Sequence, residues 1–253
     1  MPGPLRDLLT LAGLVRERGL RHTGRMSALA VRGRWMAAAD RRREAPFGVS
    51  SDGPVELWEL TIDSANRVLG FPYVPSPGLL VDTLLGSLDE DLSQFCFVDF
   101  GSGKGRVLLV AAHHPFREVV GVEFSPELHE IASGNIRSYT SPARRCRNVH
   151  SVCADAASFA IPQGNRVLYF NNPFAGPVFA RVLANIRAAH ERVPHKSYVL
   201  YQQLAGDLEA DRTDNIATLQ RAAFLRERRV RFPSRRVRFL LGSYELRIFE
   251  SVD

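Results

Sequence analysis

An apolar run followed by three alternating glycines most constrains what this chain can fold into. The run FVDF at residues 97–100 precedes Gly101, Gly103 and Gly105, and the apolar sequence RVLLVAA begins at Arg106. This order is typical of a buried strand, a tight turn and the first turn of a helix. Side chains on such a turn would collide with a group that approaches the backbone, and glycine removes them. The stretch therefore predicts a ligand cradle at the end of a strand in an α/β sheet.

The glycine spacing separates this turn from two common phosphate-binding motifs. A dinucleotide fingerprint needs glycine at the position of Arg106, and a P-loop needs glycine at the position of Val98. The spacing D-x-G-x-G-x-G, which begins at Asp99, is instead the pattern of S-adenosylmethionine (SAM) binding. Asp99 is expected to accept hydrogen bonds from the turn and from the methionine ammonium of SAM. The cofactor-binding residues predicted on this turn are Asp99, Gly101, Ser102, Gly103 and Gly105.

Two further apolar runs end in residues that suit the same ligand. The run VVGVE ends at Glu123, 20 residues after Gly103, where a carboxylate can bind both hydroxyls of a ribose. The run VHSVCA leads to Asp155, which we expect at the exocyclic amine of adenine. The backbone N–H of Ala156 is then available to the adenine ring. Because parallel strands end at one edge of a sheet, these residues predict a single site.

A fourth run, RVLYF, ends in Asn171, Asn172 and Pro173. An Asn-Pro turn at this edge can present the Asn172 side-chain oxygen to an amine N–H and leave the nitrogen lone pair facing the methyl group of SAM. Asn171 is predicted to contact the cofactor. Tyr73 precedes a helix that begins near Ser76, so we expect it at the mouth of the site. A packed ring with a bonded hydroxyl explains Tyr73 equally well. The candidate catalytic residues are Asn172 and Tyr73.

Alternating strands and helices predict a doubly wound α/β fold. Helices are expected after successive strands, and two closing strands are expected at about residues 224–232 and 239–249. These elements predict a Rossmann-like sheet of seven strands, mostly parallel, with an antiparallel last strand. A loop rich in Gly, Ser and Pro near residues 47–54 predicts a domain boundary. We therefore expect a basic helical extension over residues 1–46 and a catalytic domain over residues 47–253.

The N-terminal extension carries the net charge of the protein. Residues 1–46 hold ten Arg and four acidic residues, a net charge of +6 that equals the net charge of all 253 residues. Helices are predicted over residues 5–20 and 26–43. Three interpretations stay open: a helical cap over the site, a surface for an anionic or protein partner, or a partly disordered or targeting segment similar to a mitochondrial presequence.

Composition limits the remaining classes of protein. The three cysteines form no CxxC pair and no even disulfide set, which favours a reducing compartment, and the seven histidines show no metal-ligand spacing. No metal site is predicted, and no apolar run approaches membrane-spanning length. The ratio of 31 Arg to 2 Lys indicates GC-rich coding, so a high isoelectric point does not by itself predict a nucleic-acid partner. A bacterial, cytoplasmic protein is expected.

On these motifs the chain resembles the class I SAM-dependent methyltransferases, and within them bacterial proteins similar to the non-SET-domain histone lysine methyltransferases. The matching segments are FGV at 47–49, YVPSP at 73–77, VDFGSGKGRVLL at 98–109, PF…VVGVEFSPELHEIA at 115–132 and VLYFNNPF at 167–174. The resemblance spans about residues 47–205. It implies an active-site role for Asn172 and SAM contacts at Asp99, Gly101, Gly103, Gly105, Glu123 and Asp155.

Two departures from that family pattern fall near the expected acceptor site. Ser50 and Ser51 replace an expected Asp-Thr pair, and Gln202 and Gln203 stand where related sequences tend to have Asn-Pro. Both changes can reshape the pocket for the methyl acceptor.

The sequence thus predicts a SAM-dependent methyltransferase that acts on an amine nitrogen of a small molecule or a protein side chain. No catalytic His or Lys is evident, which favours N- over O-methylation, and a lysine acceptor would make activity rise with alkaline pH. Three alternatives stay open: an O-methyltransferase, a nucleic-acid methyltransferase, and a methyltransferase fold repurposed for cyclisation, elimination or partner binding. Phe174 follows a single proline, which weakens the nucleic-acid alternative.

Overall fold

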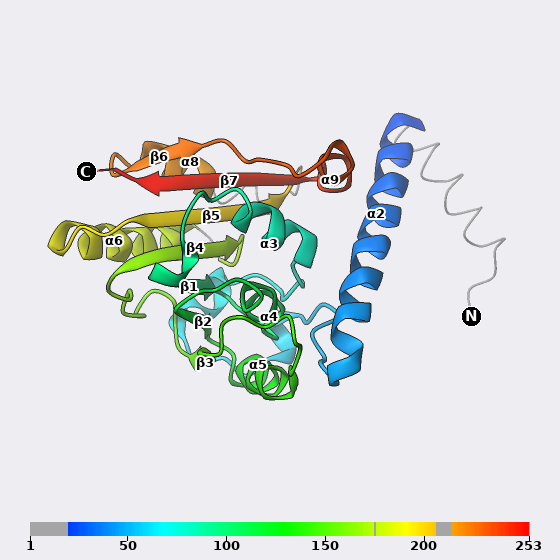
Figure 1. Ribbon diagram of the computed structural model, residues 1–253, viewed down its shortest axis with the longest axis horizontal. Helices are drawn as coiled ribbons and strands as arrows, with labels where there is room; N and C mark the ends of the chain where they lie inside the picture. The colour runs from blue at the N-terminus through cyan, green and yellow to red at the C-terminus, as the bar shows by residue number, and fades with distance from the viewer. Residues whose placement is uncertain (1–19, 175, 206–213, 253) are drawn as a thin grey trace.

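A single seven-stranded sheet forms the centre of the protein (Figure 1). The computed structural model describes residues 20–174, 176–205 and 214–252. The strand order is β3-β2-β1-β4-β5-β7-β6. The strands are β1 Phe95–Phe100, β2 Glu118–Glu123, β3 Val149–Cys153, β4 Asn165–Asn171, β5 Ser197–Leu204, β6 Leu225–Arg228 and β7 Tyr244–Ser251. Strands β1 to β5 pair in parallel, whereas β7 is antiparallel to both β5 and β6. The predicted fold class is confirmed.

Helices cover both faces of this sheet. The helices of the described residues are α2 Leu20–Glu44, α3 Gly78–Leu85, α4 Arg106–Ala111, α5 Pro126–Ser138, α6 Gly176–Arg192, α8 Asn215–Arg221 and α9 Arg235–Leu240. Short 3-10 turns lie at η1 Ala45–Phe47, η2 Leu57–Glu59, η3 Ala65–Leu69 and η4 Leu92–Gln94. Helices α3 and α4 pack against one face, and α6 and α8 pack against the other.

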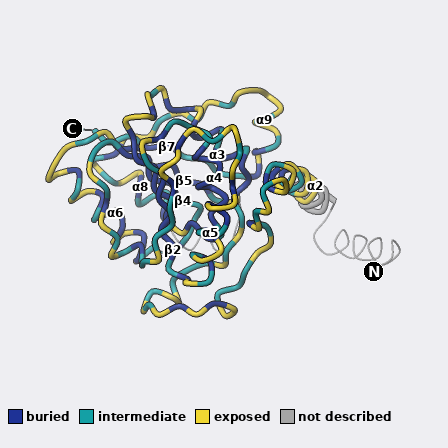
Figure 2. Tube along the Cα trace, turned by 60° about the horizontal axis from the view of Figure 1, so that its bottom comes forward, coloured by how far each residue is buried: buried dark blue, intermediate teal, exposed yellow. Residues whose placement is uncertain are grey.

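Alternation along the strands divides the core into two layers. In β1, Phe95 and Phe97 face the layer that holds α3 and α4, whereas Cys96, Val98 and Phe100 face the layer that holds α6. All six residues of β1 are buried, which explains why the strand reads as a continuous apolar run rather than an alternating one. Figure 2 shows the buried segments concentrated in the sheet and exposed residues along loops and one side of α2.

The C-terminal strands are shorter than the sequence predicts. The residues predicted as strand at 229–232 and 239–243 lie outside β6 and β7, and helix α9 stands between the two strands. The Ser234 hydroxyl caps α9 by accepting a hydrogen bond from the Val237 backbone N–H at 3.2 Å. Val237 and Leu241 are four residues apart and both pack on the core, which is helical spacing. The cap and this spacing favour a helix where the sequence predicts the start of a strand at residue 239.

Helix α2 is the described part of the N-terminal extension, and it contains the predicted helix over residues 26–43. The helix predicted over residues 5–20 lies outside the described residues apart from Leu20. Figure 1 shows α2 standing across the side of the sheet where the parallel strands end. Met36 of α2 is 3% exposed and belongs to the core. In the described part of the chain, no helix is long and apolar enough to cross a membrane.

The buried Arg106 guanidinium joins α2 to the first turn of α4. Its Nε donates to Glu44 Oε1 and to Ser51 Oγ, each at 2.8 Å, and its Nη2 donates to Asp52. Asp40 Oδ2 lies 3.7 Å from Nη1. Burial alone would lower the pKa of Arg106, but the hydrogen bonds with Glu44 and Asp52 outweigh it and raise the pKa. The network fixes α2 and the loop after it over the glycine turn.

Replacing Arg106 with methionine should lower the free energy of unfolding by about 3–5 kcal/mol, because the change leaves Asp40 and Glu44 as buried charges without their partner. Urea unfolding followed by circular dichroism measures the change. The matched control is Arg187→Met, which removes an exposed ion pair with Glu191 and should cost about 0.5 kcal/mol or less. Equal losses in the two variants would contradict the structural role of Arg106.

Candidate active site

The glycine turn after β1 is closed by the side chain of Tyr73. Gly103 has φ +52°, and a Cβ atom placed on it would lie 2.1 Å from the Tyr73 ring, so no other residue fits there. A Cβ on Gly101 would lie 2.7 Å from Pro173. A Cβ on Gly105, which has φ +84°, would lie 3.1 Å from the Ala132 side chain of α5. The predicted turn thus forms a cradle between β1, β2 and the Asn-Pro turn.

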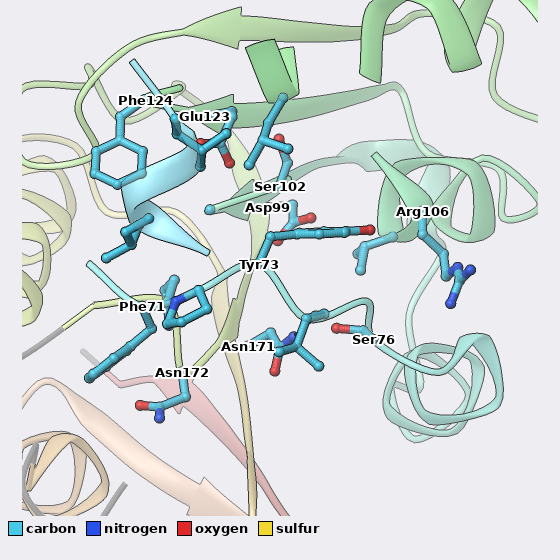
Figure 3. Close-up of a pocket in the computed structure, with 18 residues that line it drawn as sticks. Phe71, Tyr73, Ser76, Asp99, Ser102, Arg106, Glu123, Phe124, Asn171 and Asn172 are labelled. Carbon is cyan, nitrogen blue, oxygen red and sulfur yellow. The ribbon is translucent and has the colours of Figure 1, made fainter. Parts of the chain in front are cut away.

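Glu123 ends β2 under this cradle with its carboxylate held by the backbone. Its Oε2 accepts from the Gly103 N–H at 2.8 Å, and its Oε1 accepts from the Ser125 N–H at 2.9 Å. Burial raises the pKa of Glu123, although these backbone hydrogen bonds oppose the shift. Each carboxylate oxygen keeps lone-pair capacity for a further donor. Glu123 lines the pocket in Figure 3 and can therefore bind a ligand hydroxyl there.

Asp99 lies near the end of β1, and one of its carboxyl oxygens has no hydrogen-bond partner among the described residues. Asp99 is 1% exposed, and this oxygen is Oδ2. Burial raises the pKa of Asp99 well above its usual range, and the charge of Glu123 adds to the shift. The buried Ser102 hydroxyl also lacks a partner within the described ranges. A cationic, hydrogen-bonding ligand group would satisfy both side chains.

Two adjoining pockets meet at this point. The pocket of Figure 3 is lined by Asp99, Ser102 and Glu123 on its polar side. A second pocket shares Gly101, Phe124 and Pro173 with the first. Its other walls are mostly apolar and include Ala154, Ala156, Phe174 and Val178. The combined space therefore offers carboxylates at one end and a mostly apolar slot at the other.

Asp155 and Ala156 both line the apolar slot, as the sequence predicts for residues near an adenine ring. The Asp155 carboxylate is already bonded within the protein. Its Oδ2 accepts from Ser64 Oγ at 2.6 Å and from Asn66 Nδ2 at 2.8 Å, and its Oδ1 accepts from the Ala157 N–H at 2.8 Å. Sequence reasoning missed Ser64 and Asn66, whose only signal is the N-cap that Ser64 provides for η3. Asp155 thus fastens η3 to the end of β3.

The two asparagines of the Asn-Pro turn point in different directions. The Asn171 Nδ2 donates to the Val74 carbonyl at 3.2 Å. Asn172 has φ +37°, a left-handed conformation that asparagine adopts more readily than most residues. Its Oδ1 accepts a hydrogen bond from the Tyr201 hydroxyl at 2.7 Å, and Figure 3 shows its side chain directed away from Asp99 and Tyr73. Both asparagines line the pocket, but neither side chain is without partners.

Tyr73 both lines the pocket and has a hydrogen-bonded hydroxyl, which are the two alternatives that the sequence left open. Its ring lines the pocket, and its hydroxyl donates to the Ser51 carbonyl at 2.6 Å. Lys104 Nζ lies 5.3 Å from the ring centroid and donates to the Asp52 carbonyl at 2.8 Å. Burial raises the pKa of Tyr73, so its hydroxyl stays protonated and acts as a donor. Tyr73 therefore fastens the loop around Ser51 over the glycine turn.

Comparisons with known proteins show distant likeness only. No protein-family model matches the chain, and a search of curated proteins finds no match. Phosphoethanolamine N-methyltransferase 1 of Haemonchus contortus is 17% identical with a TM-score of 0.39, and the match covers 51% of this chain and 26% of that one. An rRNA methylase from Streptococcus thermophilus is 14% identical over 68% of this chain and 94% of its own, with a TM-score of 0.44.

An RNA methyltransferase from Salinibacter ruber, solved with S-adenosyl-L-homocysteine, is 20% identical with a TM-score of 0.40. The match covers 70% of this chain and 92% of that one. This chain spans about a quarter of the Haemonchus protein, as the 26% coverage shows. Similarities this distant transfer neither activity nor substrate to this chain.

Asp99→Asn should stabilise the protein at neutral pH, by on the order of 1 kcal/mol, because it removes a buried carboxyl that lacks a partner for Oδ2. The pKa of Asp99 is raised in the folded state, so the wild type loses stability as pH rises from about 4, the unfolded pKa, toward the folded pKa. The advantage of the variant should therefore grow over this window and vanish below it.

Urea unfolding at several pH values measures this gap between variant and wild type. The control is Asp63→Asn at an exposed position, which should change the free energy of unfolding by less than about 0.5 kcal/mol at every pH. An advantage of Asp99→Asn that is absent at pH 7, or constant with pH, would show that Asp99 carries no burial penalty.

Proposed function

We propose that this protein is a SAM-dependent methyltransferase that acts on an amine nitrogen. The observation that carries the proposal is the buried carboxyl of Asp99, whose Oδ2 lacks a partner among the described residues, beside Glu123 at the glycine cradle. A ligand that fits must bring a cation to Asp99, hydroxyl groups to Glu123 and a flat apolar ring to the slot beside Phe124. SAM carries an ammonium, a ribose and an adenine in that order.

The same carboxyls disfavour phosphate-bearing cofactors. Asp99 and Glu123 both line the pocket at the turn, where a dinucleotide or nucleoside triphosphate would place its phosphates. A carboxylate and a phosphate close together repel strongly in a buried environment. Arg106 also lines this pocket, but its guanidinium is bonded to Glu44, Ser51 and Asp52. The polar groups at this turn therefore favour a cationic ligand.

Four of the predicted residues have a defined role in the proposed complex. Asp99 and the Ser102 hydroxyl bind the ammonium, Glu123 binds the ribose hydroxyls, and the Ala156 N–H bonds the adenine ring. Phe124, which follows Glu123 directly, lines both pockets and packs on the ring. Bound SAM supplies a methyl group on a positively charged sulfur. The protein contributes binding and orientation, which can account for much of the rate of such a transfer.

Asn172 and Tyr73 are proposed to position the acceptor. The Asn172 Oδ1 accepts one hydrogen bond from Tyr201, and a carbonyl oxygen can accept a second from the acceptor N–H. Tyr73 excludes water by covering Gly103 with its ring. Its raised pKa makes it unsuitable as a base, which agrees with an acceptor that needs none.

We further propose that residues 1–46 form an extension to a catalytic domain over residues 47–253. The Arg106 network supports a capping role for α2, because it holds Glu44 and Asp40 against the glycine turn. Arg34 and Arg42 are exposed on α2, so the outer side of the helix is basic and suits an acidic protein partner better than a nucleic acid that must enter the pocket. A cytoplasmic location in a bacterium remains our expectation.

Calorimetric titration with S-adenosylhomocysteine tests the cofactor site. Wild-type protein should bind with a micromolar dissociation constant, and Glu123→Ala should weaken binding at least about tenfold because the ribose loses its acceptor. Glu118→Ala is the matched control, since Glu118 begins the same strand at the end remote from the pocket. Its binding should equal that of wild type.

Binding unaffected by Glu123→Ala would place the ligand elsewhere. No binding to folded wild-type protein would overturn the proposal and favour a methyltransferase fold repurposed for another reaction or for partner binding.

A further inference from the structure

A third pocket adjoins the proposed cofactor site at the ends of β4 and β5. It shares Phe71, Ser76, Asn171 and Asn172 with the pocket of Figure 3. Its remaining walls come from the proline-rich segment at residues 72–77, from the end of β5 and from the start of β7. A molecule in this space lies next to the Asn-Pro turn, where the proposed function requires the methyl acceptor.

No charged side chain lines this third pocket within the described ranges. The walls carry rings and aliphatic groups together with uncharged amides and hydroxyls. The residues are Phe71, Pro72, Val74, Pro75, Ser76, Pro77, Asn171, Asn172, Gln202, Gln203, Leu204 and Tyr244. Burial raises the pKa of the Tyr244 phenol, so it stays neutral. The carboxyls of Asp99 and Glu123 line the neighbouring pocket instead.

A chain of amide hydrogen bonds fixes the orientation of Gln202. The Val74 carbonyl can only accept, so the Asn171 amide must present its Nδ2 to it, at 3.2 Å. The Asn171 Oδ1 then accepts from Gln202 Nε2. With its Nε2 used in this bond, the Gln202 amide has only its Oε1 left to accept a further hydrogen bond. Gln202 is 2% exposed, and this Oε1 has no hydrogen-bond partner among the described residues.

An unpartnered buried carbonyl is a strong selector of ligands. It has lost its hydrogen bonds to water on burial, and only a ligand that donates an N–H or O–H restores one. A ligand without a donor leaves the oxygen without a hydrogen bond. This lowers affinity more than the packing that a slightly smaller ligand loses. Gln202 occupies one of the two positions where the sequence departs from the Asn-Pro of similar proteins. The departure thus has a structural consequence in this pocket.

We propose that this pocket binds a neutral, largely apolar acceptor of the arylamine type, whose N–H donates to Gln202 Oε1. The inference rests on the proposed function for its chemistry, but the binding preference can be measured independently. A protonated alkylamine such as a lysine side chain would lose its hydration without gaining a carboxylate, which is costly. A carboxylated or phosphorylated acceptor would find no Arg or Lys among the lining residues.

The absence of a base in the lining is consistent with the same acceptor class. No lining side chain within the described ranges is a carboxylate, imidazole or amine that could take a proton from an alkylammonium. An arylamine is already neutral at pH 7 and keeps its nitrogen lone pair available. Gln202 would hold its N–H while the proline-rich wall packs on the ring. Gln202 is therefore a specificity-determining residue in this proposal.

Four naphthalene probes of nearly equal shape separate the alternatives. 1-Aminonaphthalene is a neutral donor, 1-methylnaphthalene has no donor, 1-(aminomethyl)naphthalene is a cation and 1-naphthoate is an anion at pH 7. Dissociation constants are measured by ligand fluorescence, with and without saturating S-adenosylhomocysteine. The wild type should bind 1-aminonaphthalene at least about tenfold more tightly than each of the other three.

Substitutions at Gln202 should change this order in opposite ways. In Gln202→Leu, the advantage of 1-aminonaphthalene over 1-methylnaphthalene should fall below about threefold, because the acceptor oxygen is gone. In Gln202→Glu, which is isosteric, 1-(aminomethyl)naphthalene should bind more tightly than 1-aminonaphthalene. Gln220→Leu, at an exposed position on α8, is the matched control and should keep the wild-type order. If Gln202→Leu does not fold, the order of probe dissociation constants in the wild type and in Gln202→Glu still tests the proposal.

Two outcomes overturn the inference. One is wild-type protein that binds the cationic or anionic probe as tightly as 1-aminonaphthalene, and the other is a donor advantage that survives Gln202→Leu. Probe binding and S-adenosylhomocysteine binding are read separately, so the two proposals can fail separately. Protein that binds S-adenosylhomocysteine but none of the probes loses the acceptor assignment and keeps the cofactor site. Protein that binds 1-aminonaphthalene as expected but not S-adenosylhomocysteine keeps the third pocket and loses the methyltransferase proposal.

Discussion

The rest of the site depends on one buried guanidinium. Arg106 begins α4 directly after the glycine turn, and it bonds Glu44 of α2 together with Ser51 and Asp52 of the following loop. A buried cation is stable only with such partners, so the network holds only when α2 and the loop are in place. The loop in turn accepts the Tyr73 hydroxyl at Ser51. One ion-pair network thus fixes α2 and the loop around Ser51 relative to the glycine turn.

Charge is arranged in opposite ways on the two sides of this network. Arg106 is neutralised by several carboxylates, whereas Asp99 and Glu123 form no ion pair with any cation among the described residues. The Asp99–Glu123 pair destabilises the fold in the absence of a cationic ligand, which is typical of binding sites that trade stability for function. Among the described residues no charged side chain lines the third pocket, and the Gln202 Oε1 there lacks a hydrogen-bond partner. Each pocket is therefore selective for a different kind of group.

Local signals predicted much of the fold. The apolar runs that end before Gly101 and at Glu123 correctly mark parallel strands. The prediction missed helix α9, Arg235–Leu240, and wrongly assigned residues 239–243 to a strand. A run of six residues contains too few turns for its periodicity to decide between the two.

The sequence by itself determined the glycine cradle, the acidic ends of the first two strands and the order of elements, because each depends on neighbours along the chain. Only the tertiary structure decided which partners the polar side chains have. Asp155 bonds Ser64 and Asn66 from far upstream, and Asn172 bonds Tyr201 from the next strand. The orientation of Gln202 likewise depends on contacts across the sheet edge. Such contacts join residues distant in the chain, so no local pattern records them, and they determine which atoms remain free for a ligand.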